Sequence, residues 1–178
     1  MKITDKIDEK YIFFIAMMTA LASSLNLLEM FIPKPLPFMK IGLSNIIVLI
    51  LVFSEFYKEA IIVAFSKSII GAFLSGLLFS PTFLLSLGGN LVSCILMIIF
   101  SKALKNITIF GVSVIGSYFH LLTQLIIMRI FIIQNNSILL LYPLIAVISI
   151  LTGLLTGMIG SLFNKYIDMR SVYVKACV

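Results

Sequence analysis

The stretch that decides the fold reads Glu29-Met-Phe-Ile-Pro33-Lys34-Pro35-Leu-Pro37-Phe-Met-Lys40-Ile-Gly42-Leu-Ser44-Asn45. Its three closely spaced prolines cannot continue an α-helix, and they stiffen the backbone into an extended form. Apolar runs that are candidates for membrane spans lie on both sides of it. The stretch therefore predicts a rigid connection between two spans, with charged and amide side chains held at the rim of a helix bundle.

The composition places the chain in a bilayer. Hydrophobic residues make up 61% of the 178 positions and charged residues only 11%, and the mean hydropathy is +1.20. A soluble domain keeps about a quarter of its residues charged. The formal charge of +6 is explained by membrane topology rather than by nucleic-acid binding. Cys94 and Cys177 have neither metal-ligand nor redox spacing and give no reason to expect a disulfide.

Six apolar runs predict an all-α, polytopic membrane protein with six transmembrane helices. They cover about residues 11–32, 41–56, 60–79, 82–100, 107–133 and 138–163. Because a helix needs roughly 20 apolar residues to cross the bilayer, the second run is short and the last two are long enough to tilt. We expect one integral membrane domain over residues 1–178, with the bundle at about 11–163 and a cytoplasmic tail at 164–178.

The basic start of the chain and the sequence Ala20-Leu21-Ala22 are also features of a cleaved signal peptide. However, the apolar run continues to Ile32, which is too long for a signal sequence and favours a retained span.

Lysine and arginine residues predict the orientation. With both termini in the cytoplasm, the outer side carries only Lys34 and Lys40, whereas the inner side carries Lys2, Lys6, Lys10, Lys58, Lys102, Lys105, Lys165, Arg170 and Lys175. The positive-inside rule favours this arrangement, which turns the Pro-rich stretch outward. The absence of Trp and the abundance of Ile, Phe and Lys suggest a bacterial protein, so we expect it in the cytoplasmic membrane of a bacterium.

Lys67 lies near the middle of the third predicted span. A lysine at that depth costs about 2.5–3.5 kcal/mol on insertion scales, so it needs a partner or a wet cavity. Small residues share one helical face with it, at Ala64, Gly71 and Ser75. A ligand site and a structural role, through an ion pair with Glu29 or snorkelling, are both open.

The fifth span carries the only histidine, His120, with Gln124 one turn later on the same face. A lone histidine has no companion ligands for a metal ion, so we expect no metal site. It is either a hydrogen-bonded interior residue or one wall of a pocket. Arg129 lies on a different face, where it snorkels to the surface or reaches an anion.

Two spans contain closely spaced glycines. In the fourth, Gly88 and Gly89 precede Asn90 and predict a close backbone approach or local unwinding. In the sixth, Gly153, Gly157 and Gly160 have the spacing of a helix-packing face.

The outer half of the predicted bundle is net cationic. Lys34, Lys40, Lys67 and Arg129 stand against Glu29. A cavity open to that side would suit a small anion with a hydrophobic or aromatic body. The chain has no Gly-x-x-x-x-Gly-Lys-[Ser/Thr] sequence for binding nucleotide, and we expect no cofactor.

Six short spans, a basic start and Ala16-Met-Met-Thr-Ala20 in the first span resemble the substrate-binding S components of energy-coupling factor (ECF) vitamin transporters. The resemblance implies that the Ala16/Ala20 face docks a transmembrane coupling subunit, which works with cytoplasmic ATPases. Ordinary helix packing is the alternative for this spacing.

A second resemblance rests on two longer runs. The Pro-rich stretch from Leu28 to Ile46, and Phe83-Leu84-Leu85-Ser86-Leu87-Gly88-Gly89-Asn90, resemble the Gx transporter family, whose members are often labelled heptaprenyl diphosphate synthase component I. The resemblance covers about residues 11–163. Prenyl diphosphate synthases hold magnesium through aspartate-rich motifs, which this chain lacks, so we expect no catalysis.

These observations predict a membrane subunit that captures a small anionic, vitamin-like or cofactor-like molecule from the extracytoplasmic side. The expected binding residues are Glu29, Lys40, Asn45, Lys67, Asn90, His120, Gln124 and Arg129. Glu29 would contact an amine or anchor Lys40. Two alternatives stay open: a non-catalytic accessory subunit of a prenyl diphosphate synthase in isoprenoid biosynthesis, or a partner of a flavin-based membrane redox system.

Overall fold

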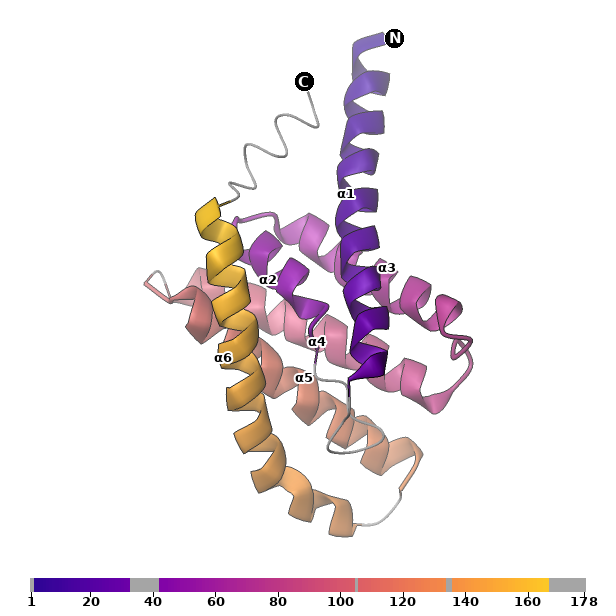
Figure 1. The fold of residues 1–178 in the computed structure, drawn as a ribbon, viewed down its shortest axis with the longest axis vertical. Helices are drawn as coiled ribbons and strands as arrows, with labels where there is room; N and C mark the ends of the chain where they lie inside the picture. Colours follow the sequence, from indigo (N-terminus) through magenta and orange to yellow (C-terminus); the bar gives the residue numbers. More distant parts are fainter. Residues whose placement is uncertain (1, 33–41, 105, 134–135, 167–178) are drawn as a thin grey trace.

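The computed structural model describes residues 2–32, 42–104, 106–133 and 136–166 of the chain. Within these ranges every regular element is a helix, which confirms the all-α prediction (Figure 1). The elements are α1 (Lys2–Leu28), η1 (Glu29–Phe31), α2 (Asn45–Phe53), α3 (Tyr57–Leu74), α4 (Pro81–Ala103), α5 (Ile109–Phe131), η2 (Asn136–Leu141) and α6 (Tyr142–Tyr166), where η marks a 3-10 helix.

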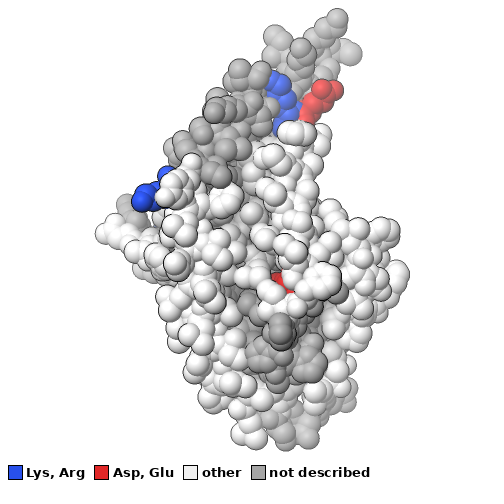
Figure 2. All heavy atoms as spheres, in the orientation of Figure 1, with Lys and Arg blue, Asp and Glu red and all other residues white. Residues whose placement is uncertain are grey.

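Four helices of the described chain are long and apolar enough to cross a membrane. They are α4, α5, α6 and the part of α1 from Glu9 to Leu28. The molecule is therefore built as a multi-pass membrane protein. Its surface agrees: the described residues on the face in Figure 2 are almost wholly uncharged, and the charged side chains coloured there lie mainly toward the end where α1 begins.

The other two α-helices, α2 and α3, differ from these four. Helix α3 has 18 residues, three of which are charged. Helix α2 has nine residues, which span roughly 14 Å, about half of the hydrocarbon thickness. The apolar run at 41–56 therefore forms a much shorter helix than a full membrane crossing requires.

Helix α2 forms the centre of the fold. Its residues Ile46–Val52 are all buried, because the helix is apolar all round and needs cover on every side. It packs against α1, α3, α4, α5 and α6, and in Figure 1 it lies between the long helices α1 and α6. The turn that precedes α2 is consequently held inside the bundle rather than at its surface.

The glycines of α6 pack against neighbouring helices, as their spacing predicts. A methyl group on Gly153 would lie 2.6 Å from Val114 Cα, and one on Gly157 would lie 3.2 Å from Phe110 Cα. At Gly160 the nearest atom would be Leu49 Cδ2 at 3.0 Å. These glycines let α6 approach α5 and α2 closely.

We expect Gly153→Ala to destabilise the bundle by about 1–3 kcal/mol, because the added methyl group meets the backbone of α5, which cannot move aside cheaply. The measurement is the thermal unfolding midpoint of the purified protein in detergent. The neighbouring exposed residue provides the control, since Leu154→Ala is expected to change stability by no more than about 0.5 kcal/mol. Equal midpoints for Gly153→Ala and the wild type would contradict this packing.

Candidate functional site

Buried polar side chains gather where the end of α1 and the turn before α2 meet α3, α4 and α5. We call this set the polar cluster. It consists of Asn26, Glu29, Ser44, Asn45, Lys67, Ser68, Ser86, Asn90, His120 and Gln124, of which only Asn45 is more than slightly exposed. A polar group inside a membrane bundle is costly unless it is hydrogen-bonded, so such a concentration needs an explanation.

Glu29 lies at the end of α1, where the chain tightens into η1. Its carboxylate is buried, with the residue 1% exposed. One carboxylate oxygen accepts a hydrogen bond from the Gly42 backbone N–H at 2.9 Å, and the other accepts one from the Leu43 N–H at 3.0 Å. Gly42 has φ = +89°, a conformation that favours glycine. Glu29 therefore fixes the first half of the turn that leads into α2.

Lys67 fixes the second half of the same turn. It is fully buried in α3, and its ammonium group donates to Ser44 Oγ at 3.1 Å and to Asn45 Oδ1. The side chain therefore points into the bundle and does not snorkel to the surface. Two charged residues from different helices thus hold adjacent residues of one buried turn.

His120 and Gln124 reach the turn from α5. Gln124 Nε2 lies 2.9 Å from His120 Nε2, one helical turn away. The imidazole ring packs against two glycines: a methyl group on Gly42 would lie 3.4 Å from His120 Cδ2, and one on Gly89 would lie 2.9 Å from His120 Nδ1. The close approach predicted at Gly88 and Gly89 therefore makes room, at Gly89, for the histidine.

Asn90 connects α4 to α3. Its side-chain amide donates to Ser68 Oγ at 2.7 Å and, more weakly, to Ser86 Oγ at 3.5 Å. Asn26 of α1 packs on Gly71 of α3, where a methyl group would lie 2.2 Å from Asn26 Nδ2. These contacts extend the cluster from α1 across α3 to α4.

The structure brings together six of the eight residues predicted to bind ligand: Glu29, Asn45, Lys67, Asn90, His120 and Gln124. Arg129 is exposed in the last turn of α5, and Lys40 lies outside the described residues. Sequence reasoning missed Asn26, Ser44, Ser68 and Ser86. Two of them stand at helical spacing from a predicted residue, Asn26 from Glu29 and Ser86 from Asn90, whereas Ser44 and Ser68 are only sequence neighbours of Asn45 and Lys67.

The cluster is tightly packed in this state. An adjoining cavity between α2, α4, α5 and α6 has a volume of about 10 Å³, which is room for one water molecule at most. It is lined by Asn45, Leu49, Ser93, Met97, Ser113, Gly116, Ser117 and Thr156. A ligand of vitamin size would therefore require the helices or the turn to move apart.

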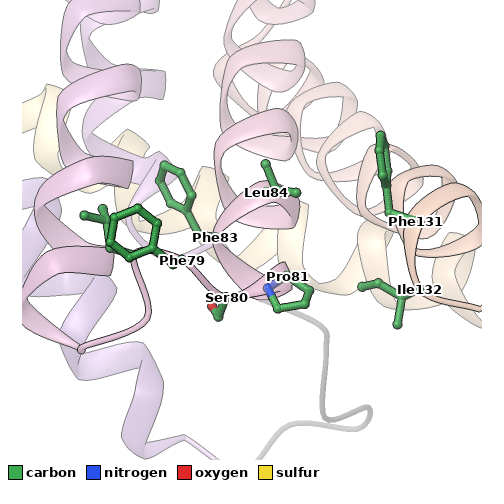
Figure 3. A pocket seen from close by; sticks show the side chains of 8 residues that line it. Phe79, Ser80, Pro81, Phe83, Leu84, Phe131 and Ile132 are labelled. Carbon is green, nitrogen blue, oxygen red and sulfur yellow. The ribbon is translucent and has the colours of Figure 1, made fainter.

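Larger hollows lie on the surface of the described chain, and two of them bear on a ligand or a partner. One, of about 490 Å³, is an apolar pocket at the α3–α4 turn and the end of α5, where Phe79, Pro81, Phe83 and Phe131 line it with few polar atoms (Figure 3). Its one hydroxyl, Ser80, already bonds the Leu77 carbonyl oxygen. This pocket has the character of a lipid-facing surface rather than of a site for a polar ligand.

The other hollow is a groove of about 640 Å³ between α1 and α3. It contains both alanines of the predicted docking face, Ala16 and Ala20, which are exposed. Thr19 and Ser23 also line it, and their buried hydroxyl oxygens have no hydrogen-bond partner in the part of the chain that the structure describes. Other helix hydroxyls, such as those of Ser24 and Ser68, bond a backbone carbonyl of their own helix.

No group of three or more His, Cys, Asp or Glu side chains that could hold a metal ion occurs among the described residues. The chemistry that the cluster offers is recognition by one ammonium group, backbone N–H donors, side-chain amides, hydroxyls and an imidazole.

Comparison with known proteins gives one match. No curated protein and no solved structure matches the chain. A family model described as heptaprenyl diphosphate synthase component I matches residues 18–163. The match contains every member of the polar cluster and Ala20, and it begins just after Ala16. Since it covers most of the chain, this protein belongs to the heptaprenyl diphosphate synthase component I family.

Proposed function

We propose that this protein is a non-catalytic, membrane-embedded subunit that captures a small anionic molecule in the polar cluster. The observation that carries the proposal is the fully buried Lys67 ammonium group beside a turn whose backbone N–H groups already hold a carboxylate. A buried cation inside a membrane domain marks a ligand or ion pathway more often than a stabilising contact.

In this proposal the ligand's charged group meets Lys67, and Asn45, Asn90, His120 and Gln124 supply directional hydrogen bonds. Arg129 and Lys40 attract the anion toward the bundle from the outer side. All six α-helices form the membrane domain, with both termini in the cytoplasm and the Pro-rich stretch outside.

The proposal includes transport of the ECF type. The groove between α1 and α3 would then receive a helix of a transmembrane coupling subunit, and cytoplasmic ATPases would supply the energy. The two buried, unpaired hydroxyls beside the groove support a protein occupant: rotation about χ1 would bring each to a hydrogen-bond partner on a docked helix, whereas a lipid chain offers none.

The family match favours a second candidate, an accessory membrane subunit of a heptaprenyl diphosphate synthase. Here a soluble prenyltransferase would bind the cytoplasmic side, and the membrane subunit would serve its substrate or product. The anion that binds in the polar cluster would then be a diphosphate.

Native mass spectrometry of the purified protein distinguishes the two. A substrate-binding subunit is expected to release a co-purified small anion, at a stoichiometry that falls on dialysis. An accessory subunit is expected to co-purify with a prenyltransferase, and to lose it when the cytoplasmic end of α1 is removed. Release of no anion under any purification condition would contradict ligand capture.

A further inference from the structure

The Glu29 carboxylate is bound in the way that proteins bind a foreign anion. Each of its two oxygens accepts one hydrogen bond, and the donors are successive backbone N–H groups, of Gly42 and Leu43. Successive N–H groups that converge in this way form a concave site for anionic oxygens. The group that fills it comes from a different helix, 13 and 14 residues earlier in the chain.

A buried cation lies beside this turn. Lys67 is fully buried, and it bonds Ser44 and Asn45, the next two residues after the N–H pair. A positive charge so near in a medium of low dielectric constant strengthens the attraction for any anion at the N–H pair. A turn that needed only to be closed would not require a buried ammonium group.

The residues that would recognise the rest of a ligand surround the same glycine. A methyl group on Gly42 would approach Asn45 Nδ2 to 3.1 Å and His120 Nε2 to 3.6 Å. Gly42 is therefore where the N–H pair, an amide and an imidazole converge. An anionic group bound here would have side-chain hydrogen-bond donors and acceptors beside it.

From these contacts we infer that the Gly42–Leu43 turn is a binding site for a carboxylate or phosphate group, which the protein's own Glu29 fills in this state. Capture of the ligand is then an exchange, in which the ligand's anionic group replaces the Glu29 carboxylate on the two N–H groups. The inference rests on the proposed function, which identifies the polar cluster as the ligand site. It adds that the ligand is recognised through a carboxylate or phosphate group, and that Glu29 competes with this group.

The test removes the internal anion and supplies a small one. In Glu29→Gly the carboxylate is absent and the space of its side chain is open. Sodium acetate, which reproduces the terminal CH2–COO⁻ of the lost side chain, is expected to raise the thermal unfolding midpoint of this variant saturably, by roughly 2–4 °C or more. Acetamide, the neutral analogue, is expected to have no such effect.

Glu29→Gln provides the matched control. Glutamine fills the same space, but its NH2 group faces an N–H donor, so this variant should lose stability and not respond to acetate. An acetate effect of equal size in Glu29→Gln, or no difference between acetate and acetamide in Glu29→Gly, would overturn the inference.

If Glu29→Gly does not fold without acetate, the wild-type protein decides the question. In a sample labelled with ¹⁵N-glycine, titration with inorganic diphosphate is expected to move the amide resonance of Gly42 saturably. A Gly42 resonance that never moves would overturn the exchange.

The outcome separates this inference from the proposed function. A co-purified anion without any acetate rescue would retain ligand capture and reject the exchange. Acetate rescue without a co-purified anion would retain the anion site and reject capture as the protein's role.

Discussion

Replacing Lys67 with methionine is expected to lower affinity for the captured anion on the order of 10- to 100-fold, while the protein still folds and inserts. Among the cations whose exposure the structure describes, Lys67 alone is fully buried, and a hydrogen bond to a charged group contributes about 1.5–3 kcal/mol. Methionine keeps the volume and removes the charge, so Ser44 and Asn45 lose a donor, but the cost of burying an ion also disappears.

The measurement is a binding titration with the anion that native mass spectrometry identifies. Lys67→Ala should lose the same affinity and, in addition, some stability, because it leaves a cavity. Lys102→Met is the matched control: it removes an ammonium group that lies 4.4 Å from the ring centre of Tyr57, near the end of α4 and away from the cluster. Unchanged affinity in Lys67→Met would remove Lys67 from the ligand site and leave it a purely structural residue.

The helical fold follows from composition and hydropathy, because a chain this apolar must satisfy its backbone hydrogen bonds within helices. The length of α2 could not be predicted in the same way. The predicted span at 41–56 contains Ser44, Asn45, Ser54 and Glu55, and the helix covers only Asn45–Phe53. Contacts with distant residues set its start, since Glu29 and Lys67 hold the turn before it. Just after its end, Glu55 adopts the left-handed conformation with φ = 69°, which cannot be predicted from hydropathy.

Six of the ten members of the polar cluster were predictable as residues, but their arrangement was not. Charges and amides inside apolar runs identify Lys67, Asn90, His120 and Gln124, since each is costly in a membrane unless it has a partner. The partners themselves depend on tertiary structure. The sequence predicted an amine or Lys40 beside Glu29, and Lys40 lies outside the described residues. The two backbone N–H groups that the Glu29 carboxylate binds could not be predicted, because they have no signature in side-chain chemistry.

The second large effect is expected at the groove between α1 and α3. If it docks a coupling subunit, Ala16→Leu combined with Ala20→Leu should abolish association, because both alanines line the groove and two leucine side chains would fill it. The measurement is co-purification with the organism's own coupling subunit, expressed together with this protein. Val147→Leu, which enlarges an exposed residue of α6, should leave association unchanged.

Removing the unpaired hydroxyls of the groove is expected to affect stability and association in opposite directions. Thr19→Val and Ser23→Ala should each make the isolated protein as stable as the wild type or up to about 1 kcal/mol more stable, because a buried hydroxyl without a partner is removed. The same variants should weaken docking several-fold, because each hydroxyl, once rotated about χ1 toward the groove, would bond the partner helix inside the bilayer. A variant that loses both stability and association would indicate a simple packing role for these residues. Undiminished association in the double leucine variant would place the docking surface elsewhere on the bundle.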